Sequence, residues 1–513
     1  MTPIAALVLC ATAAQPQLPP SAFQPAPGVA DRLAEVSPER VHATVEKLES
    51  FGTRHTLSDT TSPTQGIGAA RTWLRDELQS YSRSLSATLE EFDAPKSVRL
   101  PDGAHLANVV AVLPGTSEVA KDRAYYIAGH YDSRNGDAMD VSGTAPGAND
   151  DASGVAAVLE CARVLAQHPC ESTIVFLCTA GEEQGLVGAT YHAKQLATEK
   201  KFRLVQVLNN DIVGDPSPAQ ELARASALER QMGEYADMVA RQNSENGAAE
   251  QPEGGDQNGG EGAGLSTTGR SAGSSANDLM KSMTQMVRPD WWNVRIFSEG
   301  LPRGAGAEAL ARIRSEGAES DSSSRQLARF VSYVAAREQT DIRPVLVFRQ
   351  DRFLRGGDHA AFNESGFGAV RFTVPAEDYS RQHQNVTEKD AKPYGDLATF
   401  VDADYLADVT RLNLATLIHL ANAPTPPANA RIVTAELSTD TVLKWNASPE
   451  PDTAGYEVVY RLTTEPDWTG VTDATNATEL RVPLSKDNYF FGVRAYDKDG
   501  YRSPVSFAWA SKE

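Results

Sequence analysis

The chain has 513 residues, of which 41% are hydrophobic, and a formal net charge of −20 at pH 7. A chain of this length is too long to fold around one ordinary hydrophobic core, so two or three folded units are expected. The acidic balance argues against a nucleic-acid partner, because no basic cluster is available to neutralise phosphates.

The first residues predict export. The apolar stretch over residues 4–14 is too short to cross a bilayer and contains the small residues "ATA". Residues 1–14 are therefore interpreted as a signal peptide, which makes the protein secreted or periplasmic. No later stretch is long and apolar enough to predict a membrane span.

Three cysteines remain after such a cleavage: Cys161, Cys170 and Cys178. Three cysteines cannot all pair within one chain. A Cys161–Cys170 disulfide is one reading for an exported protein, and buried free thiols are the other. The sequence leaves this choice open.

A Pro-rich leader over residues 15–28 precedes two helical patterns, over residues 38–50 and 66–80. Strands and helices then alternate. Strands are expected from Ala107, from Ala124, in "STIVFLC" and from Arg203, with a helix from Gly154. Such alternation is typical of an α/β fold with a mixed, mostly parallel β-sheet flanked by helices.

Residues 243–276 contain almost no apolar side chain, so a disordered insertion is predicted there. The insertion includes "GRSAG", which matches the GxSxG nucleophile elbow. An elbow needs a strand before it and a helix after it, whereas both flanks here are rich in Gly and Ser. The match is interpreted as accidental.

Order resumes near Trp291, with a helix from about Ser324, a strand from Arg343 and a long amphipathic helix over residues 401–423. A linker over residues 424–430 then leads to short alternating strands over residues 431–513. Trp445, Tyr456 and "YFFGVRAYDKDGYRSPVS" in this segment resemble a fibronectin type III domain. Such a module is expected to be a spacer, a stabilising part or a binder of proteins or glycans.

Carboxylates and histidines follow successive predicted strands, at the edge where α/β sheets build their sites. His130 and Asp132 share one face of a strand end, because residues i and i+2 of a strand point the same way. The other members of this set are Asp150, Asp151, Glu182, Glu183, Asp211 and His383.

Each of these clusters alone has an ordinary structural explanation, such as a rim histidine, a helix cap or a solvated turn. Their coincidence at successive strand ends favours a site. No Lys or Arg is a member of these clusters, so a pair of divalent cations is expected to neutralise the carboxylates. Nitrogen and oxygen ligands suit two zinc ions, with cobalt or manganese as substitutes.

The motifs "HYDS", "NDDASG", "GEEQGL", "NND" and the late His383 together resemble the co-catalytic di-zinc aminopeptidase family, whose relatives include glutamate carboxypeptidases and glutaminyl cyclases. The resemblance covers residues 29–423 apart from the insertion. It implies that Asp150 bridges two metals and forms a cis peptide with Asp151. It further implies that His130 and Asp211 complete one metal site, Glu183 and His383 the other.

The resemblance also implies that Glu182 is the general base and that Asp132 orients His130. Some relatives have a Tyr before the last His to polarise the substrate carbonyl, whereas this chain has Gln382, so Tyr379 is considered for that role. Asp358 and His359 are expected either to support the site or to lie in a solvated loop.

The resulting expectation is a secreted zinc aminopeptidase that acts on peptides. A carboxypeptidase is the first alternative, with Arg352, Arg355 and Arg381 as candidates for binding a substrate carboxylate. A glutaminyl cyclase and a metal-free binding protein are the others. The absence of HExxH from the sequence excludes the thermolysin type of single-zinc site.

Overall fold

The computed structural model describes residues 24–217, 232, 292–435 and 437–512. Described residues up to Asp215 and from Asn293 onward belong to one compact unit, and the described residues 216, 217, 232 and 292 are assigned to a second. The predicted signal peptide, most of the leader and the predicted insertion over residues 243–276 lie outside the described residues.

An eight-stranded sheet forms the α/β part of the first unit, in the order β1-β2-β4-β3-β5-β8-β6-β7. The neighbours β4, β3, β5 and β8 are parallel, and β1, β2 and β6 pair antiparallel. This arrangement confirms the predicted fold class. The strands are β1 (Ser86–Ala94), β2 (Ala104–Leu113), β3 (Arg123–His130), β4 (Thr173–Thr179), β5 (Leu204–Asn210), β6 (Trp292–Ser298), β7 (Ile342–Val347) and β8 (Gly368–Thr373).

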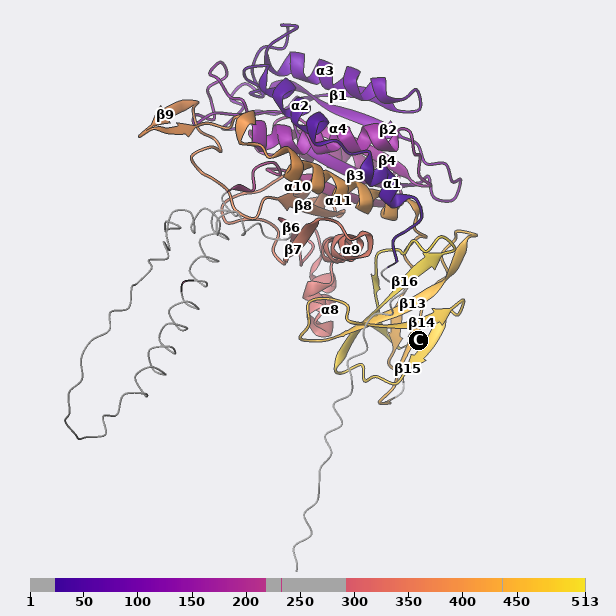
Figure 1. The fold of residues 1–513 in the computed structure, drawn as a ribbon. Coiled ribbons are helices and arrows are strands. Elements are labelled where there is room, and N and C mark those ends of the chain that lie inside the picture. Colours follow the sequence, from indigo (N-terminus) through magenta and orange to yellow (C-terminus); the bar gives the residue numbers. More distant parts are fainter. Residues whose placement is uncertain (1–23, 218–231, 233–291, 436, 513) are drawn as a thin grey trace, which may run out of the picture. The chain divides into compact units, whose positions relative to one another are not determined.

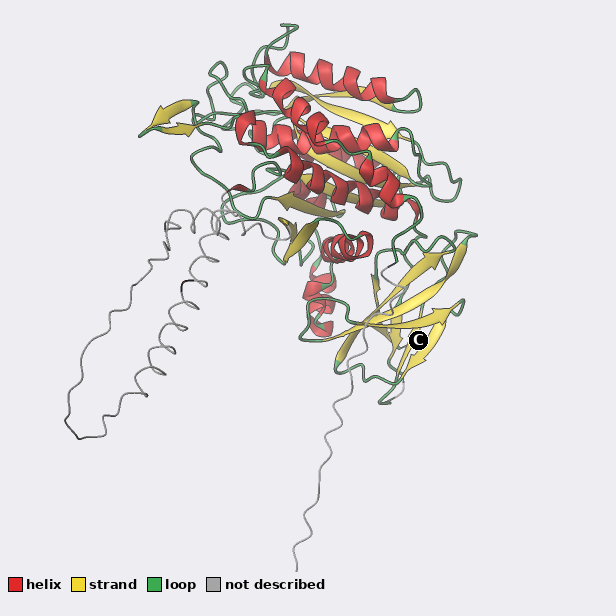
Figure 2. Ribbon diagram, viewed as in Figure 1, coloured by secondary structure: helices red, strands yellow, loops and turns green. Residues whose placement is uncertain are grey.

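Helices cover both faces of this sheet (Figures 1 and 2). In Figure 1, α4 (Ser153–Leu165) and α11 (Ala403–Asn422) lie in front of the strands. On the other face, α5 (Val187–Glu199) and α10 (His359–Glu364) pack on alternate strand residues such as Tyr126 and Leu177. The remaining helices described here are α1 (Val29–Ala34), α2 (Pro38–Glu49), α3 (Gly66–Tyr81), α8 (Ala307–Glu316) and α9 (Ser323–Glu338).

The central strands have the sequences that burial on two faces requires. Strands β3 and β4 are buried along their whole length. Their sequences, "RAYYIAGH" and "TIVFLCT", are therefore nearly continuous apolar runs rather than alternating ones. Because β3, β4 and β5 are parallel, their carboxyl ends meet at one edge of the sheet.

The C-terminal residues form two four-stranded sheets, β15-β12-β11-β18 and β14-β13-β16-β17. Their shared core contains Trp445, Tyr456 and Phe491. The all-β sandwich is thus present, while its identity as a fibronectin type III domain stays a prediction. The strands are β11 (Arg431–Val433), β12 (Thr441–Lys444), β13 (Thr453–Leu462), β14 (Gly470–Thr475), β15 (Glu479–Val482), β16 (Tyr489–Asp497), β17 (Ser506–Phe507) and β18 (Trp509–Ser511).

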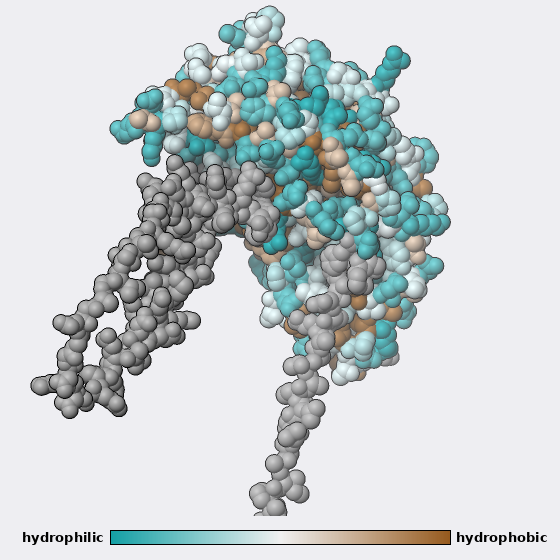
Figure 3. Space-filling model, viewed as in Figure 1, coloured by the Kyte–Doolittle hydropathy of each residue, from teal (hydrophilic) through white to brown (hydrophobic). Residues whose placement is uncertain are grey.

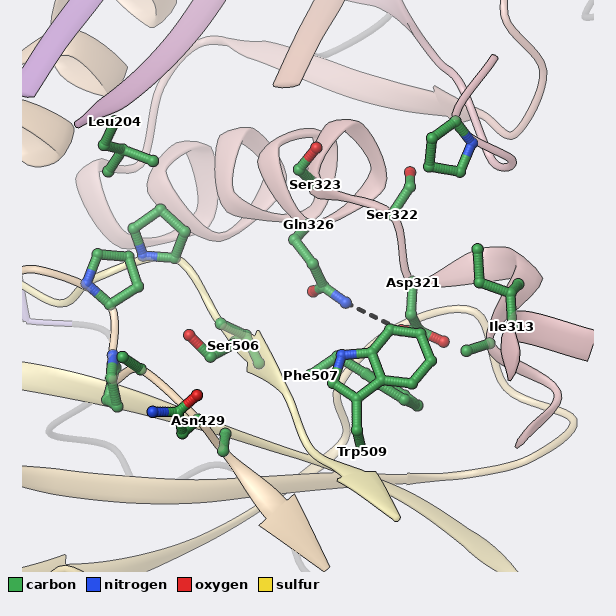
Figure 4. A pocket seen from close by; sticks show the side chains of 18 of the residues that line it. Leu204, Ile313, Asp321, Ser322, Ser323, Gln326, Asn429, Ser506, Phe507 and Trp509 are labelled. Carbon is green, nitrogen blue, oxygen red and sulfur yellow. Dashed lines mark hydrogen bonds between the residues drawn. The ribbon is translucent and has the colours of Figure 1, made fainter. Parts of the chain in front are cut away.

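Buried ion pairs join this sandwich to the α/β part. Asp321, just before α9, lies 3.2 Å from Arg329 of α9 and 2.6 Å from Arg461 of β13, and all three side chains are buried. A cavity of about 540 Å³ lies beside them. In Figure 4, Gln326 points toward Asp321, to which it donates a 2.9 Å hydrogen bond, with Trp509 of the sandwich nearby.

Most of the helices and strands predicted from sequence are present within a few residues of the expected bounds. Strands β1 and β6, helices α1, α5, α8 and α10, and the hairpin over residues 387–394 were not predicted. Cys161, Cys170 and Cys178 are buried and free, so the disulfide reading is wrong. Cys161 instead lies 3.7 Å from the carbonyl oxygen of Thr410.

The surface shown in Figure 3 is mainly hydrophilic, with scattered hydrophobic residues, as expected for an acidic globular chain. Among the described helices, none combines the length and the apolar character needed to cross a membrane.

Replacing Glu171, at the end of the loop before β4, is expected to flatten the pH dependence of stability. Burial, with a contribution from Asp452, raises the pKa of Glu171 to about 7. In the unfolded chain the pKa of this carboxyl is about 4.3, so the unfolded state loses its proton first as the pH rises. The free energy of unfolding therefore falls between about pH 4.5 and pH 7. Glu171→Gln should therefore unfold at higher temperature than wild type at pH 8, with the gap closing at pH 5. The exposed control Glu118→Gln should differ from wild type by the same amount in unfolding temperature at pH 5 and pH 8. The same behaviour in Glu171→Gln would contradict the prediction.

Candidate metal centre

The two histidines and the carboxylates predicted from sequence converge at the carboxyl edge of the parallel strands. His130 ends β3, Glu182 and Glu183 follow β4, and Asp211 follows β5. Asp150 comes from the segment that opens α4, and His383 from the loop between β8 and the hairpin β9 (Thr387–Lys389) and β10 (Lys392–Tyr394). Segments separated by hundreds of residues thus meet at one site.

The first cluster consists of His130, Glu182 and Asp211, whose ligand atoms lie within 4.8 Å of one another. Nε2 of His130 is 3.9 Å from Oδ1 of Asp211. The Nδ1 atom of His130 lies 3.1 Å from the carbonyl oxygen of Asp132 and 3.6 Å from its carboxylate. Asp132 therefore contacts the imidazole mainly through its backbone.

The second cluster consists of Asp150, Glu183 and His383, again with ligand atoms within 4.8 Å. Nε2 of His383 lies 2.9 Å from Oδ2 of Asp150 and 2.9 Å from Oε1 of Glu183. His383 has a φ of 53°, a left-handed conformation that is uncommon for a histidine. The loop is thus bent so that the imidazole turns toward the carboxylates.

Asp150 lies between the two clusters. Its Oδ1 is 3.1 Å from Nε2 of His130, while its Oδ2 faces His383. The Asp150–Asp151 peptide is cis, as the family resemblance implied. The carboxylate of Asp396 accepts hydrogen bonds from the backbone N–H groups of Asn149 and Asp150, at 2.8 and 2.7 Å. This contact holds the segment that presents Asp150.

Asp132 also holds the turn that carries the paired glutamates. Its carboxylate accepts the backbone N–H groups of Glu182 and Glu183, each at 3.2 Å, and the hydroxyl of Thr56 at 2.8 Å. With both amides held by one carboxylate, the two glutamate side chains diverge. Glu183 reaches the second cluster and Glu182 the first.

The electrostatics of the site fit a cation. Burial raises the pKa of Glu182 and of Asp151 well above the ordinary values, despite the nearby His130. Nε2 of His130 is buried and has no hydrogen-bond partner among the described residues, although carboxylate oxygens surround it. A buried imidazole nitrogen among crowded carboxylates is the donor set that zinc prefers.

One positive charge at the site was not expected from the sequence. Arg371 of β8 is buried and lies 2.9 Å from Asp211 and 3.0 Å from Asp351. The inference that no Lys or Arg neutralises these clusters is therefore wrong, because it considered only residues near them in sequence. One guanidinium still leaves the carboxylates in excess.

The other candidate residues divide into buried and exposed groups. Asp358 accepts a hydrogen bond from Thr179, at the end of β4, and His359 lies 2.8 Å from the carbonyl oxygen of Gln350. Both are buried, so the reading of a solvated loop is wrong. Tyr379 is 64% exposed, whereas Gln382 is buried and donates a 2.9 Å hydrogen bond to Asp150.

Three partners of the site were missed because nothing near them in sequence marks them: Arg371, Asp396 and Thr56. Gln382, next to His383, was noted only as the residue that stands where some relatives have a Tyr. Arg371 sits in an apolar strand sequence, "GAVRFT". A charged residue inside a fully buried strand is an unusual feature that could have indicated it.

A protein-family model described as Peptidase family M28 matches residues 108–260. A probable zinc metalloprotease of Pyricularia oryzae is 38% identical over 500 residues, which cover 96% of this chain and 85% of that protein. A second probable zinc metalloprotease, from Leptosphaeria maculans, is 38% identical over 479 residues, which cover 93% of this chain and 95% of that protein. The structure of an aminopeptidase from Aneurinibacillus sp. strain AM-1 aligns with a TM-score of 0.45 and 12% identity, covering 77% of this chain and 96% of that one.

Proposed function

This chain is a zinc metalloprotease that belongs to peptidase family M28, and we propose that it is an aminopeptidase, which removes residues from the N-terminus of peptides. The convergence of two histidine–carboxylate clusters on Asp150 carries the proposal. His130 and Asp211 would hold one zinc ion, Glu183 and His383 the other, and Asp150 would contact both. Zinc ions bound there would polarise the substrate carbonyl and lower the pKa of an attacking water.

Glu182 is the proposed general base. It lies in the first cluster, beside His130 and Asp211, and burial raises its pKa above the ordinary value of a glutamate, which makes it a stronger base. As the water oxygen bonds to the carbonyl carbon, Glu182 takes a proton from the water. The C–N bond then breaks, and Glu182 returns the proton to the leaving nitrogen.

The charges near the site support an N-terminal rather than a C-terminal substrate group. Each of the three candidates for binding a substrate carboxylate already has a protein partner. Arg352 lies 2.6 Å from Glu377, and Arg381 lies 3.3 Å from Asp378. Arg355 lies 3.8 Å from Glu377 and donates a 2.9 Å hydrogen bond to Gln382. Carboxylates remain in excess around the clusters, which suits the ammonium group of a free N-terminus.

The test compares aminoacyl-p-nitroanilides with their N-acetylated copies, with zinc measured in the same sample. Cleavage of the free-amine substrates alone, with two zinc ions per chain as the two clusters predict, would support an aminopeptidase. Full zinc content with cleavage only of N-acylated peptides that have a free C-terminus would favour a carboxypeptidase. A protein that takes up no zinc would contradict a catalytic role.

We also propose that the protein is exported, on the basis of the apolar residues 4–14. The protein recovered outside the producing cells should begin at Gln15, as N-terminal sequencing would establish. Retention of the whole chain inside the cell, beginning at Met1, would contradict export.

A further inference from the structure

Two neighbouring cavities follow one face of helix α9, between this helix and the β-sandwich. In Figure 4, Ser323 and Gln326 of α9 face Trp509 of the sandwich across the larger cavity, of about 540 Å³. The smaller cavity, of about 180 Å³, continues along α9 from Gln326 to Ala336. Because Gln326 lines both cavities, they form one groove, which we call the α9 groove.

The walls of the α9 groove suit a proline-rich peptide. Aromatic side chains from both α9 and the sandwich line it: Phe330, Tyr333, Trp468, Phe507 and Trp509. Proline-rich segments in polyproline II conformation dock in grooves lined by aromatic side chains, because little conformational entropy is lost when such a segment binds. The shape and the lining therefore favour an extended, proline-rich occupant.

The α9 groove also contains hydrogen-bond donors that lack an acceptor. Arg329 and Arg494 line the smaller cavity and are 5% and 6% exposed. Nη2 of each guanidinium is buried and has no hydrogen-bond partner in the described part of the chain. Because an unsatisfied buried donor is unfavourable, an occupant that supplies acceptors is expected there.

The N-terminal leader has the composition that these donors require. Residues 15–23 read "QPQLPPSAF" and include Pro16, Pro19 and Pro20. Proline has no N–H group but keeps its carbonyl oxygen, so the segment offers more acceptors than donors. In a polyproline II conformation these carbonyls have no internal partner and would be free to bind a guanidinium. Leu18 and Phe23 add apolar side chains that suit aromatic walls.

The described chain begins at one end of the α9 groove. The carbonyl oxygen of Gln24 accepts a 2.8 Å hydrogen bond from Nε of Arg337, in the last turn of α9. Nη1 of the same arginine donates to the carbonyl oxygen of Gly500 in the sandwich, at 2.5 Å. Residues 15–23 are thus attached where α9 meets the sandwich, and an arginine of α9 already binds a leader carbonyl at that point.

Residues 15–23 are also long enough to follow the groove. From Arg337 back to Ser323, α9 measures about 21 Å at 1.5 Å per residue. A polyproline II chain covers this length in about seven residues, at about 3.1 Å each. A leader that runs antiparallel to α9 would therefore bring Pro20 level with Arg329 and Leu18 to the larger cavity.

We propose that residues 15–23 bind in the α9 groove and fasten the sandwich to the α/β part. Leu18 occupies the larger cavity, and carbonyl oxygens of the leader accept hydrogen bonds from Arg329 and Arg494. The inference is independent of the proposed peptidase function, because the groove is lined by none of the residues of the two metal clusters.

The first test compares two forms of the protein that differ only in beginning at Gln15 or at Gln24. A fluorescently labelled peptide with the sequence of residues 15–23 is titrated into each form, and its anisotropy is measured. The shorter form should bind the peptide. The longer form should bind it at least tenfold more weakly, because its own leader competes at an effective concentration of about millimolar. A peptide with Pro19→Ala and Pro20→Ala should bind the shorter form roughly tenfold more weakly.

Two results of this titration would overturn the inference. Equal binding by both forms would mean that the groove is open to a proline-rich segment of another protein. No binding by the shorter form would mean that the groove does not take this segment at all.

A groove variant tests where the peptide binds. Ala336 is exposed and lines the smaller cavity, so Ala336→Trp should fill that cavity without disturbing the core. The variant of the shorter form should bind the peptide at least tenfold more weakly. Ala309→Trp, at an exposed position of α8 that lines neither cavity, is the matched control and should bind as the parent does. An unchanged affinity in Ala336→Trp would place the peptide elsewhere and overturn the inference.

Photocrosslinking tests the direction and the position of the leader in the longer form. Leu18 is replaced by p-benzoylphenylalanine, and the irradiated protein is digested and examined by mass spectrometry. The crosslink should join position 18 to residues 322–326 or 504–509 of the same molecule, which line the larger cavity. A covalent dimer would assign the groove to the leader of a second copy. Either a dimer or crosslinks only outside the groove would overturn the inference.

Discussion

Glu182→Gln is expected to lower kcat by roughly 10²–10⁴-fold while both zinc ions stay bound. The amide keeps the size of the side chain but cannot accept a proton from water. The backbone N–H of residue 182 still donates to Asp132, so the turn should keep its conformation. Metal content and kcat measured on the same preparation check this result.

The neighbouring glutamate provides the matched control. Oε1 of Glu183 lies 2.9 Å from Nε2 of His383, in the second cluster, so Glu183→Gln is expected to lose zinc as well as activity. Glu182 is also close enough to His130 and Asp211 to contact an ion in the first cluster. If Glu182→Gln lost zinc to the same extent as Glu183→Gln, Glu182 would be a metal ligand and the general-base assignment would be wrong.

Asp321→Ala is expected to destabilise the protein by about 3–5 kcal/mol, because it leaves two buried guanidinium groups without their shared carboxylate. Arg329 and Arg461 are buried on either side of Asp321, at 3.2 and 2.6 Å. The change breaks one of the buried ion-pair contacts between the α/β part and the sandwich. The midpoint of urea unfolding measures the loss.

An exposed pair serves as the control for Asp321. Asp102 lies 3.5 Å from Lys96 with both side chains exposed, so Asp102→Ala should cost less than about 1 kcal/mol. Equal effects of the two substitutions would mean that the buried contact of Asp321 with Arg329 and Arg461 adds little to stability. If only Asp321→Ala lowers the stability strongly, the sandwich is more consistent with a part that stabilises the protein than with a mobile spacer.

Much of the fold was predictable because its signals are local. The apolar sequences of β3 and β4 indicate strands buried on both faces, and their alternation with helices indicates a parallel core. Strand β1 was missed because all of its residues except Phe92 and Ala94 are exposed or partly exposed, and several are charged, as in "LEEFD". An edge strand of this kind is stabilised by pairing with β2 rather than by its own apolar pattern.

The candidate site was predictable in its members but not in its contacts. Parallel strands bring their carboxyl ends together, so His130, Glu183 and Asp211 could be expected at one edge from their positions alone. The sequence could not indicate that Asp132 would hold both glutamate amides, or that Arg371 would pair with Asp211. Those contacts depend on side-chain directions within the packed sheet.

The sequence by itself determined the α/β class, the separate β-sandwich segment and the histidines and carboxylates that identify a metallopeptidase, because each is encoded by neighbouring residues or by periodicity. Only the tertiary structure decided which side chains contact one another at the site and between the α/β part and the sandwich. Gln382 meets Asp150 across 232 residues, and Arg461 meets Asp321 across 140. Such pairs form where packing excludes water and leaves buried charges no other partner, a condition that exists only once the chain has folded.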